Sequence, residues 1–352
     1  MLTRNHKVQK GFSIVELLIV SALFLVVMTA VFGILQVAGT MQESIDNSSE
    51  ILNSARVSLN STGRDAVNAG LGYSRVGGVV PDDLASTLIG LPVDLNTDRD
   101  VFTAIMAGND VNSSVLSVNG EKNDVVAFMY RDLNFNDGSA VVINNVTYSP
   151  TKINLRSVTG GCDDCRPYDL FLVESGNGNH ALAMATAITN SNSTIELEIG
   201  DPMGLNRATD VPAGERSILT PCGGGITSNC FSYSPQGTAK RVFLMSYGVN
   251  SEGVLVRKLF GNNPGAPASE QIREIPLANG VQSFQVRYLL QDGTFTDDPS
   301  NANNDQGFMN EVVQLEISIT IRPKQGLRQV TRNQLITLSS TFSTRNIKYD
   351  IE

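Results

Sequence analysis

Residues 10–23 read KGFSIVELLIVSAL, and the chain then continues without a charge through FLVVMTAVFGIL to Leu35. The uncharged run from Leu17 to Leu35 has 19 residues, which is long enough to cross roughly 30 Å of hydrocarbon as a helix. Cations and no acid precede the run within residues 1–11, and acids follow it (Arg4, Lys7, Lys10; Glu43, Asp46, Glu50). This asymmetry predicts that the N-terminus stays in the cytoplasm and that the rest of the chain crosses the membrane.

Three interpretations of this segment compete. A cleaved secretory signal has a shorter apolar run and a small-residue cleavage site, and VFGILQVAGT is a poor match to such a site. A plain signal anchor explains the run and the cations, but it gives no reason for Glu16. An acid costs on the order of 2.5–3.5 kcal/mol at the centre of a bilayer, and less near the interface. The third interpretation gives Glu16 a role.

The string KGFSIVELLIVSAL resembles the class III signal of type IV prepilins and of type II secretion pseudopilins. The matching features are a basic leader, a glycine, an aromatic residue, a four-residue step to an acid and an apolar helix. The resemblance implies that residues 1–11 are a leader peptide and that prepilin peptidase cuts between Gly11 and Phe12. It also implies that the same enzyme N-methylates Phe12, and that Glu16 is the acidic fifth residue of the mature chain.

Cleavage after Gly11 would create a cationic amine at Phe12, one helical turn from Glu16. A buried carboxylate is tolerated when a cation neutralises it. In a bundle of parallel helices, the amine of a neighbouring subunit can also reach Glu16. Because that partner arrives only on assembly, we expect the charge pair to favour the filament and to set its register.

The helix is expected to continue beyond the membrane. Apolar positions recur at three- and four-residue steps, which predicts an amphipathic helix (Val37, Met41, Ile45, Leu52, Ala55, Leu59). Residues 12–35 form the predicted transmembrane half, and residues 36–62 form the amphipathic half. One helix over 12–62 would be roughly 75 Å long. Two separate helices fit the pattern as well, because Gly33 and Gly39 each weaken a helix by about 1 kcal/mol. Gly70 and Gly72 suit the end of the helix.

Residues 63–352 are predicted to form a β-rich periplasmic domain. Residues 79–124 read as loops and short helices, and strand patterns follow (125–130, 140–148, 168–174, 193–200, 241–249, 253–261, 281–290, 312–321). VVQLEISITI at 312–321 alternates apolar and polar residues, which is typical of a half-buried antiparallel strand. The predicted fold is α+β and pilin-like, with the long N-terminal helix packed on an antiparallel β-sheet.

Other segments resemble PilW-like minor pilins, and in part the J-type pseudopilin, more loosely than the N-terminus does. They are GRDAVNAGLGYSRVGG at 63–78, the hairpin from Tyr247 to Arg257, LANGVQSFQVRY, and TFSTRN at 341–346. The block 79–240 has no such match and is large for a pilin core, so we expect an insertion within it.

The four cysteines lie after the predicted membrane span, in an oxidising compartment (Cys162, Cys165, Cys222, Cys230). Four cysteines allow three pairings. The interpretation that we favour closes two small loops, Cys162–Cys165 and Cys222–Cys230, and cross-linking between the loops is the alternative. CxxC also suggests zinc or a redox dithiol, although the second spacing is seven residues and no histidine lies close.

Two segments place oxygen ligands at alternate positions, as calcium loops do (Asp94, Asn96, Asp98, Asp100; Asp132, Asn134, Asn136, Asp137). Neither is an EF-hand, because the glycine at the sixth position and the glutamate at the twelfth are missing. We expect solvated loops and no metal, and calcium binding stays open as the alternative. His180 lies in the polar stretch GNGNHA, where a surface histidine is expected.

Composition excludes some classes of function. The net charge is −9 with 41% apolar residues, which disfavours a nucleic-acid partner and a disordered chain. Walker loops, dinucleotide fingerprints and nucleophile elbows are missing, so we predict neither enzyme activity nor a cofactor.

The resemblance implies a minor pilin that is held in the bacterial inner membrane by one span, with its C-terminal domain in the periplasm. The protein would then enter a type IV pilus at the cell surface, at or near the tip, and prime assembly. The implied partners are prepilin peptidase, other minor and major pilins, the pilus assembly platform and the inner membrane. A J-type pseudopilin of a type II secretion system, or a tip adhesin, stays open as an alternative.

Overall fold

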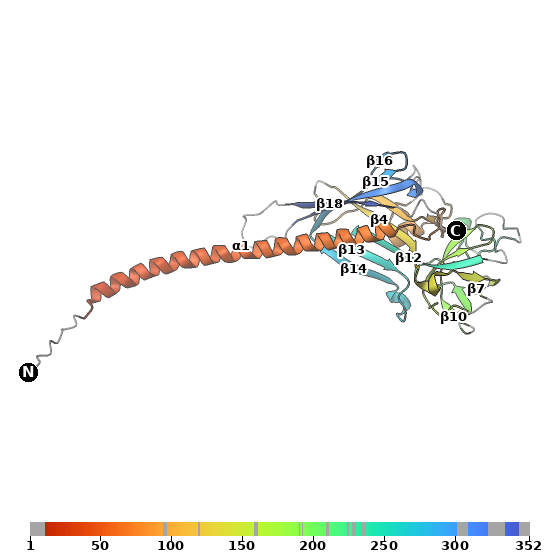
Figure 1. The fold of residues 1–352 in the computed structure, drawn as a ribbon, viewed down its shortest axis with the longest axis horizontal. Coiled ribbons are helices and arrows are strands. Elements are labelled where there is room, and N and C mark those ends of the chain that lie inside the picture. Colours follow the sequence, from red (N-terminus) through yellow and green to blue (C-terminus); the bar gives the residue numbers. More distant parts are fainter. Residues whose placement is uncertain are drawn as a thin grey trace, which may run out of the picture. The chain divides into compact units, whose positions relative to one another are not determined.

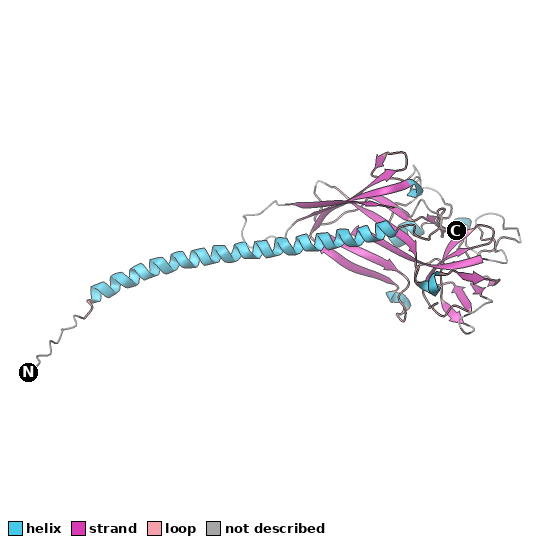
Figure 2. Cartoon of the chain, viewed as in Figure 1, coloured by secondary structure: helices cyan, strands magenta, loops and turns pink. Residues whose placement is uncertain are grey.

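The computed structural model describes residues 11–93, 97–118, 120–157, 161–189, 191, 193–208, 211–223, 225–226, 230–233, 237–300, 309–322 and 335–344. It falls into two parts, of which the first ends at Glu50 and the second begins at Ile51. The fold is α+β, as predicted: a long hydrophobic N-terminal helix is followed by antiparallel-rich sheets, and the end of the helix packs on them (Figure 2).

Helix α1 (Ile14–Asn68) is continuous over 55 residues, which corresponds to about 83 Å. It begins two residues later and ends six residues later than the predicted 12–62. It runs through Gly33 and Gly39, so the alternative of two separate helices is wrong. Gly70 and Gly72 follow its end with φ values of 81° and 62°, the left-handed conformation that glycine adopts at helix C-termini, as predicted.

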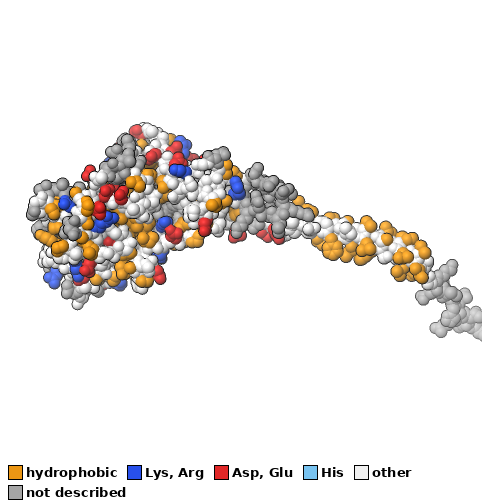
Figure 3. Space-filling view, turned by 180° about the vertical axis from the view of Figure 1, so that it is seen from behind, with side chains coloured by type: hydrophobic (Ala, Val, Ile, Leu, Met, Phe, Trp, Pro, Cys, Tyr) orange, Lys and Arg blue, Asp and Glu red, His pale blue; other side chains and the backbone are white. Residues whose placement is uncertain are grey.

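The first part of α1 presents its apolar side chains outward, as Figure 3 shows along the helix. Phe12 is 85% exposed and Leu35 is 60% exposed, and Ile14–Glu43 is long and apolar enough to cross a membrane. The hydroxyls of Ser21 and Thr29 donate to the carbonyls of Leu18 and Leu25, at 3.0 and 2.7 Å. These polar groups therefore have partners inside the helix and need none from the lipid.

The predicted amphipathic stripe is only partly correct. Val37, Met41 and Ile45 are 48%, 63% and 67% exposed, so the buried face does not begin at residue 36. Burial begins near Ala55 and continues past the predicted end, mostly through small residues (Ala55, Ser58, Leu59, Thr62, Gly63, Asp65, Ala66, Ala69). Small side chains let a helix approach a sheet closely, and a hydrophobicity pattern does not detect them.

Gly63 explains why the helix extends beyond the predicted end at residue 62. A Cβ atom on Gly63 would lie 2.0 Å from the Cε1 atom of Phe342 in strand β18 (Ile336–Ser343). The glycine therefore lets the Phe342 ring pack directly on the helix backbone. Its helix-weakening effect of about 1 kcal/mol is offset by this contact between distant segments.

The described residues of the second part form three sheets, and Figure 1 shows the last turns of α1 beside them. The first sheet has ten strands, with the path β14-β13-β12-β8-β9-β1-β2 and with β3, β4 and β5 joined to it. Its strands are β1 (Gly78–Val79), β2 (Val101–Phe102), β3 (Ile105–Asn112), β4 (Asn123–Arg131), β5 (Val141–Ile143), β8 (Leu170–Glu174), β9 (His180–Met184), β12 (Gly237–Val249), β13 (Val254–Phe260) and β14 (Ile272–Asn279).

The other two sheets have four strands each. One has the order β10-β11-β7-β6, and the other has the order β16-β15-β17-β18. Their strands are β6 (Asn145–Ser149), β7 (Lys152–Arg156), β10 (Ala187–Thr189), β11 (Thr194–Glu198), β15 (Val281–Leu290), β16 (Phe295–Thr296) and β17 (Val312–Ile321), together with β18. Short helical turns lie between strands, at Ala85–Ile89, Phe135–Gly138, Ala213–Glu215, Ala268–Glu270 and Met309–Glu311.

Two hydrophobic cores lie on opposite faces of β8 and β9. Leu170 and Leu172 of β8 belong to the larger core, which also contains α1, whereas Phe171 and Val173 belong to the smaller one. A strand that is buried on both faces reads as a continuous apolar run. This is the physical reason why residues 170–174 lack the alternation seen at 312–321.

The strand predictions succeeded where periodicity was strong. Strands β15 and β17 have the predicted bounds of 281–290 and 312–321, and β4, β8, β11, β12 and β13 overlap their predicted segments. The interpretation of 79–124 as loops and short helices is wrong for β3, which pairs with β4 in the larger core. Strand β14 was missed because Pro276 and its charges resemble a loop, and both are tolerated because β14 is at the edge of the sheet.

Two side chains at the start of β4 join the first sheet to β15. The Asn123 Oδ1 atom accepts a hydrogen bond from the Phe284 backbone N–H at 2.7 Å. The Asp124 Oδ2 atom accepts one from the Val286 N–H at 2.7 Å, and its Oδ1 atom accepts one from the Asp110 N–H at 2.9 Å. Burial is the largest influence on Asp124 and raises the pKa of its carboxyl from 3.8 to about 6, against these hydrogen bonds.

We predict that Asp124 makes the protein less stable as the pH rises from about 4 to 6. With a pKa of about 6 in the folded protein against 3.8 in the unfolded chain, the folded state binds more protons between these values. The contribution of Asp124 to the unfolding free energy is therefore greatest below pH 3.8, falls by on the order of 2–3 kcal/mol up to pH 6, and is constant above it.

Urea unfolding of the detergent-solubilised chain and of Asp124→Asn at several pH values between 4 and 7 measures this effect. Asparagine cannot accept both N–H bonds, so the variant will be less stable overall, and the readout is the slope against pH. The slope should be shallower in Asp124→Asn between pH 4 and 6. Parallel curves for the two proteins would show that Asp124 does not titrate in this range.

Candidate functional site: the N-terminal motif and the contacts that hold its helix

The residues at the start of α1 form a capping box. The Ser13 Oγ atom accepts a hydrogen bond from the Val15 N–H at 3.3 Å, and the Glu16 Oε2 atom accepts one from the Ser13 N–H at 3.3 Å. Serine before the first helical residue and glutamate three positions later satisfy two backbone donors that a helix start leaves unpaired. The carboxylate of Glu16 also lies at the positive end of the helix dipole, which stabilises it.

This geometry adds a local role for Glu16 that the sequence analysis missed, although the spacing Ser13-x-x-Glu16 is its recognised signal. Phe12 and Glu16 are exposed and lie at the same end of α1. Among the described residues, hydrogen bonding engages one carboxylate oxygen of Glu16. The other oxygen is free to meet a cation, so capping and charge pairing are compatible.

A buried ion pair fastens the other end of α1 to the first sheet. Asp65 is fully buried, and its Oδ2 atom accepts hydrogen bonds from the Arg257 guanidinium of β13 and from the Tyr247 hydroxyl of β12, both at 2.6 Å. The Tyr130 hydroxyl of β4 donates to the Asp65 Oδ1 atom at 3.4 Å. One carboxylate therefore joins the helix to three adjacent strands.

The two tyrosines respond to this environment. Burial, followed by the negative charge of Asp65, raises the pKa of Tyr247 well above its ordinary value and raises the pKa of Tyr130 to about 12. Both hydroxyls therefore keep their protons at physiological pH and act as donors to Asp65. No sequence pattern indicates this cluster, because its members are distant in the chain and an aspartate near a helix end resembles a solvated residue.

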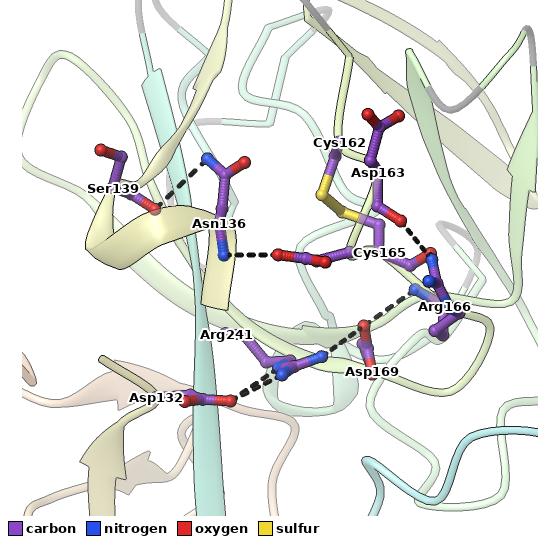
Figure 4. Close-up of a disulfide and its surroundings, with 10 residues drawn as sticks. Asp132, Asn136, Ser139, Cys162, Asp163, Cys165, Arg166, Asp169 and Arg241 are labelled. Atoms are coloured by element: carbon purple, nitrogen blue, oxygen red, sulfur yellow. Dashed lines mark hydrogen bonds and ion pairs between the residues drawn. A yellow bond between two sulfur atoms is a disulfide. The ribbon is translucent and has the colours of Figure 1, made fainter. Parts of the chain in front are cut away.

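A second charge cluster lies beside the disulfide between Cys162 and Cys165, as Figure 4 shows. Arg241 of β12 donates to the Asp132 carboxylate at 2.6 Å and to the Asp169 carboxylate at 3.4 Å, and it lies 4.5 Å from the centre of the Phe135 ring. Burial raises the pKa of Asp169, and the charge of Arg241 opposes this shift. The Arg166 N–H also donates to Asp169 at 2.9 Å, which joins the cluster to the segment that follows Cys165.

The structure contains the disulfides Cys162–Cys165 and Cys222–Cys230, with Cα–Cα distances of 5.3 and 4.9 Å. These are the pairs that the sequence analysis favoured. Cys162 and Cys165 are buried in the smaller core, and Cys222 is exposed. As disulfides, the four sulfurs provide no thiolates for zinc, and they tie down two short loops of the domain.

Two of the aspartates in the candidate calcium loops already have hydrogen-bond or ion-pair partners within the protein. Asp94 and Asn96 lie outside the described residues, and Asp98 is exposed. The buried Asp100 accepts a hydrogen bond from the Ala85 N–H at 3.0 Å. In the second loop, Asp132 pairs with Arg241, and the Asp132 Oδ1 atom accepts a bond from the Asn134 N–H at 3.0 Å. The part of the chain that the structure describes has no group of three or more His, Cys, Asp or Glu side chains that could hold a metal.

The expectation of a surface histidine at position 180 is only partly correct. His180 is the first residue of β9 and pairs with Glu174 of β8, and its Nδ1 atom is 3.9 Å from the Glu174 carboxylate. It is half-buried, and burial lowers the pKa of its imidazole, with Glu174 acting in the opposite direction. The segment that precedes it forms the turn, and the strand begins at the histidine itself.

Comparison with models of protein families matches residues 6–32 to the prokaryotic N-terminal methylation motif. The match covers part of the leader, the Gly11–Phe12 bond, Glu16 and most of the apolar run. No curated protein and no solved structure matches the chain.

The N-terminus therefore carries the N-methylation motif of type IV prepilin-like proteins and pseudopilins. This motif implies processing by prepilin peptidase, anchoring in the inner membrane by the hydrophobic helix, and subsequent assembly. Proteins with this motif are typically structural and not enzymatic.

Proposed function

We propose that this chain is a PilW-like minor pilin, cut between Gly11 and Phe12, methylated at Phe12, and inserted at or near the tip of a type IV pilus. There it helps to prime assembly with other minor and major pilins. The observation that carries the proposal is the N-terminal methylation motif, placed directly before an exposed apolar helix with Glu16 in its first turn.

Exposure along α1 supports an assembly role. Apolar side chains all around the first part of the helix must be covered by lipid or by other chains, because water does not stabilise such a surface. Before assembly the bilayer covers them, and in a filament the helices of neighbouring subunits would do so. The same helix therefore serves both environments.

The smaller core supports placement at a filament end. It is built from residues between Phe135 and Ala239, within the block for which no resemblance was found. Strands β3 and β4 from the same block belong to the larger core, so we propose that an insertion is confined to the smaller core. A bulky addition of this kind is tolerated more easily at the tip than within the shaft, where neighbours surround each subunit.

A deletion strain tests the proposal against its two alternatives. For a priming minor pilin, we expect surface filaments to fall at least tenfold and to be restored by a plasmid copy, while type II protein secretion is unchanged throughout. Loss of secretion with normal pili would instead identify a pseudopilin. Normal filaments that no longer attach to their target would identify a tip adhesin.

A further inference from the structure

A cavity of about 170 Å³ lies on the same face of the first sheet as the Asp65 cluster. Paired residues on adjacent strands form its walls: Phe243 faces Tyr130, and Leu259 of β13 lies between Met245 and Arg273. Arg257, which binds Asp65, also lines it. Because β14 carries Arg273 and is an edge strand, no further strand of this sheet covers that side of the cavity.

The two arginines leave hydrogen-bond donors without partners. The Nε atoms of both Arg257 and Arg273 are buried and have no hydrogen-bond partner within the described residues. Asp65 neutralises Arg257, whereas Arg273 makes no ion pair in the described part of the chain. The cavity therefore has one positive charge, on Arg273, that no described acidic side chain compensates.

A carboxylate fits these requirements. The Arg273 guanidinium lines the cavity without an ion-pair partner among the described residues, so a ligand that brings a negative charge is favoured. A guanidinium group presents its donors as a planar fork that matches the two oxygens of a carboxylate. The Tyr130 and Phe243 rings, whose centres are 5.5 Å apart, and Leu259 provide apolar walls for the methylene groups of an acidic side chain.

The size of the cavity suits a single side chain. A volume of about 170 Å³ corresponds to the share of roughly five or six water molecules in the liquid, and pockets for drug-sized ligands begin at about 300 Å³. One side chain fits this space, whereas most of a nucleotide or an oligosaccharide would extend out of it. The apolar walls also disfavour inorganic phosphate, a compact dianion with no apolar part.

We propose that this cavity binds the carboxylate of a glutamate or aspartate side chain from another protein chain, with Arg273 as the principal donor. The inference goes beyond the proposed function. Binding of a short peptide does not require assembly, so a negative result here would leave the pilin proposal standing.

The experiment titrates the detergent-solubilised full chain with acetyl-Ala-Glu-Ala-amide, followed by NMR or calorimetry. We expect saturable one-to-one binding, at least tenfold weaker binding of the matched Gln peptide, and competition by free glutarate. Arg273→Met should reduce binding at least tenfold, and Arg156→Met, which removes an exposed arginine of β7, should leave it unchanged.

Circular dichroism and the melting temperature check that each variant is folded. Removing the unpaired Nε donor of Arg273 should not lower the melting temperature; Arg273→Lys provides a second variant, with binding reduced several-fold because the fork is lost. Equal binding of the Glu and Gln peptides, an unchanged affinity in Arg273→Met, or binding only of phosphate or of free glutarate would overturn the proposal.

Discussion

A Glu16→Gln chain will remain in the inner membrane but will be at least tenfold depleted from sheared filaments. Glutamine at this position can still bond the Ser13 N–H and preserve the capping box, so the helix start should be retained. What glutamine removes is the negative charge. If Glu16 pairs with the cationic amine of a neighbouring subunit on assembly, the neutral glutamine loses the attraction that sets the register of the helices in the filament. Membrane insertion becomes slightly easier, because the helix no longer carries a charge.

Two further variants separate the roles of Glu16. Glu16→Ala removes both the charge and the cap, and should be at least as depleted as Glu16→Gln. Ser13→Ala removes the other half of the capping box and keeps the charge, and should cost about 1 kcal/mol of helix stability with incorporation largely preserved. Normal incorporation of Glu16→Gln would show that the charge has no part in assembly.

Among the single substitutions proposed here, Asp65→Ala is expected to lower the unfolding free energy most, by about 3–5 kcal/mol, with a corresponding fall in the melting temperature. The substitution leaves the Arg257 guanidinium half-buried without its partner, and it removes the acceptor of the buried Tyr247 hydroxyl. Because Asp65 joins α1 to three strands, the end of the helix should loosen from the sheet. Chemical unfolding of the solubilised chain measures the change.

Matched variants test whether the loss of stability in Asp65→Ala comes from breaking the Asp65–Arg257 ion pair and not from the loss of side-chain volume. Asp46→Ala, at an exposed position of the same helix, should change the unfolding free energy by less than about 0.5 kcal/mol. Combining Asp65→Leu with Arg257→Met replaces the ion pair by apolar groups and should recover part of the loss. A fall of under about 1 kcal/mol in the unfolding free energy of Asp65→Ala would show that the ion pair contributes little. The same conclusion would follow if the double variant lost as much stability as Asp65→Leu and Arg257→Met lose together.

Local periodicity explains how much of the fold could be predicted. The span ending at Leu35 and the strands at 281–290 and 312–321 have strong patterns, and the structure contains them. The two glycines that end α1 were predicted, but the buried face of its last turns was not, because it consists of small and polar residues and because Gly63 packs against Phe342 from the other end of the chain. Such contacts leave no trace in a short window of sequence.

The candidate site shows the same contrast. Gly11, Phe12 and Glu16 lie within six residues of one another, so the motif can be identified from the sequence without any tertiary structure. The partners of Asp65 come from three strands that are remote in sequence, and only the register of those strands brings them together. Likewise, Arg257 and Arg273 line one cavity because β13 and β14 pair antiparallel, and nothing in their sequence spacing indicates it.

Mass analysis of the N-terminus of the protein purified from its host decides whether the chain is processed as a prepilin. We expect a mature chain that begins at Phe12 and carries one added methyl group, with the uncut chain accumulating in a strain that lacks prepilin peptidase. Recovery of the protein with Met1–Gly11 still attached, from cells whose processing machinery works, would contradict this expectation.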